Sequence, residues 1–126
     1  MRDDWIYRRG DVYYVDFGPY RGSIQGGTRP AIVMQNDIGN FYSPLLVVVP
    51  LTSEKKKEGM VTHAMLDNIP FLKFDSMALA EQPQPVNKKQ IKKYLGKLNK
   101  EQIAKVEKAL LQEFGISYIP ECVEAP

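Results

Sequence analysis

Runs of apolar residues along the chain predict several short β-strands in succession. Residues 11–17 alternate roughly between apolar and polar types and are rich in aromatic and β-branched side chains, which favours a strand. Residues 31–35 form a similar segment, and residues 45–49 are apolar without alternation, which is typical of a strand buried on both faces. Shorter strand candidates span residues 61–66 and 76–80.

Near the C-terminus the spacing of apolar residues changes from alternation to a helical period. Asn99 and Gln102 stand three positions apart, in the arrangement of a capping box that begins a helix. Gly115 follows where such a helix would stop. We therefore expect one amphipathic helix of about four turns, because Ile103, Val106, Leu110 and Phe114 recur at steps of three and four residues.

Three segments between these elements are expected to be turns or loops. Residues 18–28 carry several glycines among polar residues, which predicts a long, mobile loop. Residues 36–40 combine Asn, Asp and Gly, which predicts a turn. Residues 87–98 are ambiguous, because their lysine-rich start could begin a helix whereas residues 94–98 favour a last strand. We expect a short turn followed by a strand.

Several short strands followed by one helix indicate a mainly β protein with a terminal helix, of the α+β class. The expected architecture is a small, strongly curved antiparallel sheet or partly open barrel, capped by that helix. A length of 126 residues suits one domain, and no spacer rich in Pro, Gly or Ser divides the apolar segments. We expect residues 1–115 to form the domain and residues 116–126 a C-terminal tail.

Composition and charge exclude few classes of protein. The longest apolar run, residues 45–51, is far too short to cross a membrane, and the N-terminus has no secretion signal, so a cytoplasmic protein is expected. The formal net charge is +2, with six lysines between residues 88 and 100. A solvated basic face explains these lysines most simply, and attraction of phosphate groups is the alternative.

Several common kinds of site are excluded by residue counts or spacing. One cysteine, Cys122, and one histidine, His63, are too few for a zinc cage made by this chain. The glycine-rich segment 22–29 lacks both the lysine-hydroxyl ending of a P-loop and the spacing of a dinucleotide fold. No Gly-x-Ser-x-Gly elbow is present. We expect no metal ion and no cofactor.

Two residues at strand ends are candidates for chemistry. Arg29 precedes Pro30, which disfavours helical angles at Arg29 and holds it extended at the start of a strand. A guanidinium held in this way suits a phosphate, although it could instead bridge the loop to a carboxylate. Thr52 follows the apolar run, where we expect Pro50 to interrupt strand pairing. By itself, such a threonine usually satisfies a local backbone group.

Ordered blocks of residues extend this pattern over almost the whole chain, from about residue 7 to residue 115. The blocks are Arg9–Tyr13, Val15–Pro19, Gly22–Ser23, Gln25–Pro30, Gln35–Asp37, Gly39–Asn40, Ser43–Pro44, Pro50–Ser53, Thr62–His63, Glu81–Gln82, Gly96 and Leu98. In these blocks the chain resembles the MazF/PemK (Kid-like) toxins of type II toxin–antitoxin systems. The resemblance implies an SH3-like barrel with the PemK-like toxin fold, and a homodimer that cleaves single-stranded RNA in a sequence-specific way. It also implies an acidic antitoxin that occupies the RNA-binding groove.

The resemblance also implies catalytic roles for Arg29 and Thr52. In cleavage by the 2′-OH of the RNA itself, Arg29 would neutralise charge on the nonbridging phosphate oxygens while Thr52 donates a hydrogen bond. The products would be a 2′,3′-cyclic phosphate and a 5′-OH. Glu81 is a candidate proton acceptor, and a carboxylate that holds a loop or an interface is the equally open alternative. His63 is expected to be structural, with catalysis as the minority interpretation.

The residues that the resemblance assigns to RNA binding are Phe17, Gly22, Ser23, Gln25, Thr28, Ser53 and Gln82. Tyr20 and Tyr42 could also stack on unpaired bases, although packing is the simpler expectation for both. The chain departs from the family pattern at Gln84 and Pro85, and at Leu79, where the Kid-like branch has an arginine linked to proton transfer. These departures argue against transferring that branch's acid–base scheme. A different class of function, a noncatalytic binder that inhibits a protein such as DNA gyrase, is the alternative.

Overall fold

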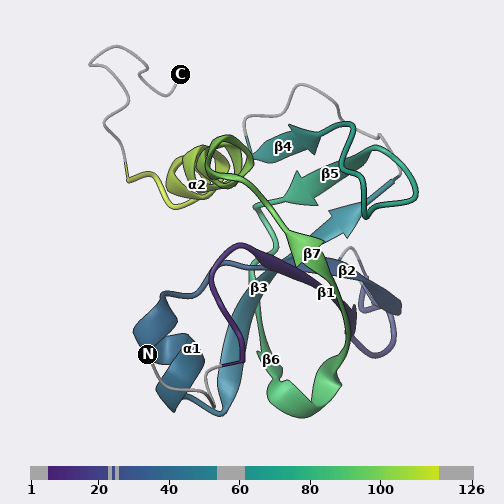
Figure 1. The fold of residues 1–126 in the computed structure, drawn as a ribbon, viewed down its shortest axis with the longest axis vertical. Coiled ribbons are helices and arrows are strands. Elements are labelled where there is room, and N and C mark those ends of the chain that lie inside the picture. The colour runs from purple at the N-terminus through teal and green to yellow at the C-terminus, as the bar shows by residue number, and fades with distance from the viewer. Residues whose placement is uncertain (1–5, 23, 25, 54–61, 117–126) are drawn as a thin grey trace.

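A computed structural model describes residues 6–22, 24, 26–53 and 62–116 of the chain (Figure 1). These residues form a strand-rich body with one long helix. In chain order the elements are β1 (Asp11–Asp16), β2 (Thr28–Val33), α1 (Asp37–Tyr42), β3 (Leu45–Thr52), β4 (His63–Leu66), β5 (Ser76–Leu79), β6 (Gln84–Asn87), the 3-10 helix η1 (Lys88–Gln90), β7 (Ile91–Lys97) and α2 (Lys100–Glu113). The expected mainly β fold with a terminal helix is confirmed.

The strands form one antiparallel sheet in the order β4-β5-β3-β2-β1-β7, with β6 pairing with β3 off this path. The two halves of β3 take different partners: residues 45–48 pair with β6, and residues 51–52 pair with β5. The sheet therefore divides at β3 into a curved half and a half that packs beneath α2 (Figure 1). Within the described residues no ladder joins β6 to β7, so the barrel is partly open.

Pro50 does not interrupt β3, contrary to the expectation from sequence. It lies inside the strand and is opposite Ala31 of β2. On the other edge of β3, Pro50 falls between Val48, the last residue paired with β6, and Leu51, the first paired with β5. A proline has no N–H to donate, and this change of partner is where a missing donor costs least. As a result, β3 continues as far as Thr52.

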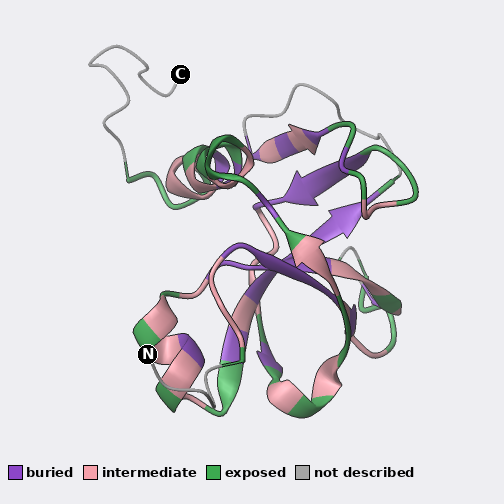
Figure 2. Ribbon diagram, in the orientation of Figure 1, coloured by how far each residue is buried: buried purple, intermediate pink, exposed green. Residues whose placement is uncertain are grey.

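Alternation along the strands builds two hydrophobic clusters, and Figure 2 shows buried residues in both halves of the sheet. Val12 and Ile32 point to the cluster beneath α2, whereas Tyr13 and Val33 point into the curved half of the sheet. The side chains of successive strand residues lie on opposite faces, so both faces of β1 and β2 are buried. Full burial of one such aliphatic side chain contributes roughly 1.5–3 kcal/mol, and the two clusters hold rigid the strand ends that carry the candidate residues.

The capping box predicted for the terminal helix is present. Asn99 Oδ1 accepts from Gln102 N at 2.8 Å, and Gln102 Oε1 accepts from Asn99 N at 2.8 Å. The buried side of α2 includes Val106 and Ala109, and Gly115 follows it with a positive φ of 66°. No helix among the described residues is long and apolar enough to cross a membrane.

Two elements differ from the sequence expectations. The predicted turn at residues 36–40 is instead the start of the short helix α1, whose N-cap Asn36 accepts from Gly39 N at 2.9 Å. The predicted turn and strand over residues 87–98 are confirmed as η1 and β7, but β6 was not predicted. At β4 the structure describes a strand from His63, and Val61 lies outside the described residues.

Candidate functional site

Arg29 and Thr52 line the same surface hollow, which has a volume of about 280 Å³. The ladder between β2 and β3 ends with the pair Ala31 and Pro50. Arg29 and Thr52 each lie two residues beyond this pair, toward the same end of the sheet. Residues opposite each other in an antiparallel pair present their side chains on the same face. The sheet register therefore explains why two residues far apart in sequence share one hollow. The other polar or aromatic residues around it are Tyr14, Thr28, Ser53, Lys73, Phe74 and Ser76.

The guanidinium of Arg29 is held by the loop that precedes β2. Its Nε donates to Gly26 O at 3.0 Å, and its Nη2 donates to Tyr20 Oη at 2.5 Å. The guanidinium carbon also lies 5.7 Å from the centre of the Tyr20 ring. Among the described residues Arg29 forms no ion pair, so the alternative in which it bridges to a carboxylate has no support there. Its charge is therefore oriented by neutral partners.

Thr52 and Ser53 bring two hydroxyl groups to the hollow from the end of β3. Thr52 is 9% exposed and lies opposite Met77 of β5, whereas the next residue, Ser53, is exposed. A nearly buried hydroxyl has few rotamers available, because the strands around it fix its position. The hollow thus combines one oriented cation with a fixed hydroxyl, which is the donor set that suits a phosphodiester.

Glu81 does not line this hollow. Its Oε2 lies 2.6 Å from His63 Nε2, and the His63 side chain is only 3% exposed. His63 instead borders a second hollow between β4 and α2, together with Lys105 and Ala109. The structure therefore brings Glu81 together with His63, away from the residues that surround Arg29.

The residues expected to bind RNA do not all lie in the hollow. Thr28 and Ser53 line the hollow with Arg29. Phe17 is half-buried against the cluster inside the curved half of the sheet, and its N–H donates to Gly27 O at 3.0 Å. Gly22 is exposed with a positive φ of 61°. Gln82 follows β5 and is not in the hollow, and two further residues lie outside the described part of the chain: Ser23 and Gln25.

Sequence reasoning did not single out Lys73, Phe74 or Tyr14. Tyr14 is on β1, opposite Lys93 of β7, and the other two belong to the connection between β4 and β5. A signal was available in the segment Phe71–Phe74, where a lysine stands among aromatic and aliphatic residues. No local rule, however, connects that segment to Arg29, since the hollow that they share is formed by the tertiary structure.

Part of the lysine cluster is structural. Lys88 Nζ donates to Asn40 O at 2.8 Å, and Lys97 Nζ lies 3.3 Å from Asp11 Oδ1. Lys92 and Lys93 on β7 are exposed.

The structure also shows where the three departures from the family pattern lie. Leu79 is 5% exposed, and β6 carries Gln84 and Pro85.

A family model described as "PemK-like, MazF-like toxin of type II toxin-antitoxin system" matches residues 8–114. Among solved structures, MazF of Deinococcus radiodurans is 24% identical, with 90% of this chain and 100% of that chain covered and a TM-score of 0.76. An endoribonuclease from a mycobacterial species, solved in complex with its cognate antitoxin, is 22% identical over 89% and 98% of the two chains, with a TM-score of 0.76. The Mycobacterium tuberculosis toxin MazF-mt6 is 15% identical over 85% and 98%, with a TM-score of 0.70. These likenesses show the fold.

Proposed function

The chain belongs to the PemK-like, MazF-like toxin family of type II toxin–antitoxin systems, and from this premise we propose that it is a sequence-specific endoribonuclease that cleaves single-stranded RNA in the cytoplasm without a metal ion. The observation that carries the proposal is the shared hollow of Arg29 and Thr52. Two of the solved structures with the same fold are named endoribonucleases, which supports the choice of RNA as substrate.

In the proposed reaction the 2′-OH of the RNA attacks the adjacent phosphorus, and the bond from phosphorus to the 5′-oxygen breaks. The 2′-OH loses its proton, the leaving 5′-oxygen gains one, and the products are a 2′,3′-cyclic phosphate and a 5′-OH. Negative charge grows on the nonbridging oxygens as the phosphorus becomes five-coordinate. Arg29 neutralises this charge, and Thr52 donates a hydrogen bond to it. The charge neutralisation that a metal ion could supply is thus assigned to a guanidinium.

Arg29 is a poor proton acceptor because a guanidinium carries N–H donors and has no acceptor atom. Glu81 is the acidic residue that the family resemblance offers for this role. Its contact with His63 supports the other possibility, in which the carboxylate holds the end of β4 to the residues after β5. We propose this structural role for Glu81 and leave proton transfer at the reacting atoms to groups of the bound RNA or to water.

Substrate and antitoxin are proposed to use the same groove of a homodimer. Thr28 and Ser53, which line the hollow with Arg29, would donate to RNA beside the scissile phosphate. Phe17, Gly22, Ser23, Gln25 and Gln82 would extend the contact along the strand. An acidic antitoxin would compete for the same cations, since carboxylates and phosphates bind a guanidinium through the same pairs of donors. The toxin solved with its cognate antitoxin supports this assignment of a partner.

The first test is cleavage of RNA by purified Arg29→Ala protein. Loss of one transition-state donor commonly lowers the rate by about 10²- to 10³-fold, and the variant should remain folded because Arg29 is partly exposed. Cleavage by wild-type protein should continue in EDTA, and an RNA with a 2′-deoxy sugar at the scissile nucleotide should survive. Lys100→Ala is the matched control, since Lys100 is exposed at the start of α2 and away from the hollow.

Sequencing the 5′ ends of the products would define the preferred cleavage site. Cleavage of the 2′-deoxy substrate would overturn the mechanism. An inability of wild-type protein to cut any RNA, together with inhibition of DNA supercoiling by gyrase, would favour the noncatalytic alternative.

A further inference from the structure

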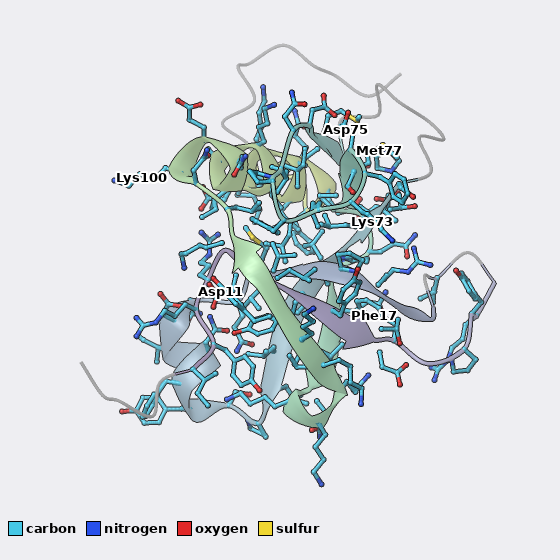
Figure 3. The ribbon with its side chains drawn as sticks, turned by 45° about the vertical axis from the view of Figure 1, so that its right-hand side comes forward. Asp11, Phe17, Lys73, Asp75, Met77 and Lys100 are labelled. Carbon is cyan, nitrogen blue, oxygen red and sulfur yellow. The ribbon has the colours of Figure 1, made fainter. Side chains whose placement is uncertain are left out.

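The connection between β4 and β5 borders the hollow and presents an unusual pair of side chains. Lys73 and Phe74 both line the hollow with Arg29 and Thr52. Phe74 is 65% exposed, although a phenylalanine in a protein of this size is ordinarily packed inside. Figure 3 shows Lys73 on the same side of the molecule as Phe17, with Lys100 on the opposite side. An aromatic ring and a cation therefore stand together at the edge of the candidate catalytic site.

Exposure of Phe74 does not result from a loose connection. Leu72 N donates to Ile69 O at 3.0 Å, and Asn68 N donates to Asp75 Oδ1 at 2.9 Å. Ser76 Oγ donates to Phe74 O at 3.0 Å. The backbone on both sides of the Lys73–Phe74 pair is thus tied down.

Packing adds a second anchor. Phe71 and Leu72 contact the hydrophobic cluster beneath α2, and the Phe71 ring lies directly against Gly96 of β7. The connection therefore packs Ile69, Phe71 and Leu72 against this cluster and leaves Phe74 in solvent. An exposed aromatic held by a fixed backbone can bind a planar ligand with little further loss of conformational entropy.

We propose that Lys73 and Phe74 form a subsite for one nucleotide next to the scissile phosphate, with the base stacked on Phe74 and a flanking phosphate paired with Lys73. This proposal rests on the proposed cleavage of RNA at Arg29 and Thr52. Its chemistry is that of single-strand recognition in general, in which an aromatic face accepts an unpaired base and a nearby cation contacts the backbone. An acidic peptide would use Lys73 but would gain little from the flat face of Phe74.

The test is equilibrium binding of a labelled, short single-stranded RNA that contains the mapped cleavage site with a 2′-deoxy scissile nucleotide. Stacking of one base changes affinity enough that Phe74→Ala should weaken binding about 5- to 150-fold. Phe74→Trp should restore it, because the indole also offers an aromatic face. Phe114→Ala is the matched control: Phe114 is 61% exposed, follows α2 and does not line the hollow.

Two abasic RNAs make the test specific, one without the base on the 5′ side of the cut and the other without the base on the 3′ side. With one of them, Phe74→Ala should cause no further loss of affinity, because the partner of Phe74 is already missing. Lys73→Ala should reduce the dependence of log affinity on log salt concentration by about 0.7, the value expected for one phosphate contact with a single strand. Lys100→Ala should leave that slope unchanged.

The subsite is overturned if Phe74→Ala weakens binding no more than Phe114→Ala does, or if both abasic RNAs still respond to Phe74→Ala. In either case wild-type cleavage would continue, and the proposed function would stand. If wild-type protein neither binds nor cuts RNA, the proposed function and the subsite fail together. Circular dichroism and thermal unfolding of each variant distinguish a lost contact from a lost fold.

Discussion

Single side chains in this protein fall into two groups, those that present charge or hydroxyl groups to the hollow and those that satisfy each other inside the fold. Arg29 belongs to the first group, because its hydrogen-bond partners in the described part of the chain are a carbonyl and a phenol, which carry no charge. His63 and Glu81 belong to the second, since a ring that is 3% exposed is bonded to a neighbouring carboxylate. Chemical type alone would have ranked His63 and Glu81 above Arg29 as proton carriers.

Glu81→Gln separates the two possible roles of this carboxylate. If Glu81 holds His63, the glutamine amide of the variant keeps a hydrogen-bonding group in place. The rate of single-turnover cleavage should then fall by less than about tenfold, which is less than the usual effect of losing an acid–base group. Urea unfolding should show a loss of about 1–3 kcal/mol, because a charged partner of a buried ring is replaced by a neutral one. A rate loss of about 10²-fold or more with unchanged stability would assign proton transfer to Glu81.

Tyr13 makes the stability of the fold sensitive to alkaline pH. Burial, followed by the nearby charge of Asp11, raises the pKa of Tyr13 well above its usual range. The unfolded chain releases this proton at about pH 10, whereas the folded chain retains it. The contribution of the protonated Tyr13 to the free energy of unfolding is therefore fully present below about pH 10 and is lost as the pH rises further.

Tyr13→Phe should flatten this alkaline loss. Its free energy of unfolding should fall less between neutral and strongly alkaline pH than that of wild type, as measured by urea unfolding at a series of pH values. The hydroxyl of Tyr13 also donates to Asp11 Oδ2 at 3.4 Å, so a small constant loss at neutral pH is expected as well. An equally steep alkaline decline in the variant would show that other groups cause it.

At the scale of elements, β3 and the connection after β4 build the site. β3 pairs with β2 as far as Pro50 on one edge and with β6 and then β5 on the other, so its last residues, Leu51 and Thr52, are held by β5. The connection between β4 and β5 is fixed through Phe71, whose ring occupies the space that a side chain at Gly96 would need. The edge strand β7 thus supports the position of Lys73 and Phe74 without touching the hollow itself.

Gly96→Ala tests that support. A Cβ at residue 96 would collide with the Phe71 ring, and overpacking of this kind typically costs about 1–3 kcal/mol. We expect a lower urea midpoint together with weaker RNA binding, although residue 96 is outside the hollow. In a Phe71→Leu background the added cost of Gly96→Ala should shrink, because the smaller side chain leaves room for the methyl group. An equal cost in both backgrounds would place the clash elsewhere.

At the scale of the whole molecule, one sheet and one helix hold the hollow, and we propose that residues 1–115 are sufficient for the domain. The helix α2 ends at Glu113, and the family match ends at residue 114. The cluster beneath α2 joins β1, β2, β3, β4 and β5 to the helix, so the sheet and α2 should unfold as one unit.

A chain that stops after residue 115 tests this boundary. It should keep the thermal midpoint of the full chain and cut RNA at the same rate, as followed by differential scanning calorimetry and a cleavage assay. A chain that stops after Ala104 is the control, and it should not fold because it loses Val106 and Ala109 of the core. A clearly lower midpoint for the first truncation would assign residues 116–126 to the domain.

The sequence by itself determined the features that depend on neighbours a few positions apart. The capping box of Asn99 and Gln102, the helical spacing that follows it and the apolar strand at residues 45–49 are all local patterns, and each was confirmed. The ordered motifs also identified the family, and they placed Arg29 and Thr52 as a pair before any geometry was known. The helix α1 and the strand β6 escaped prediction, because a six-residue helix and a four-residue strand containing Pro85 leave too short a pattern.

Only the tertiary structure decided which residues meet. It paired β2 with β3 in the register that brings Arg29 to Thr52, let β3 pass through Pro50 at a change of partner, and turned Glu81 toward His63. It also brought Lys73 and Phe74 from a distant connection to the same hollow. The physical reason is that side-chain spacing fixes the face of an element, whereas strand register and the packing of connections are set by the burial of the whole core.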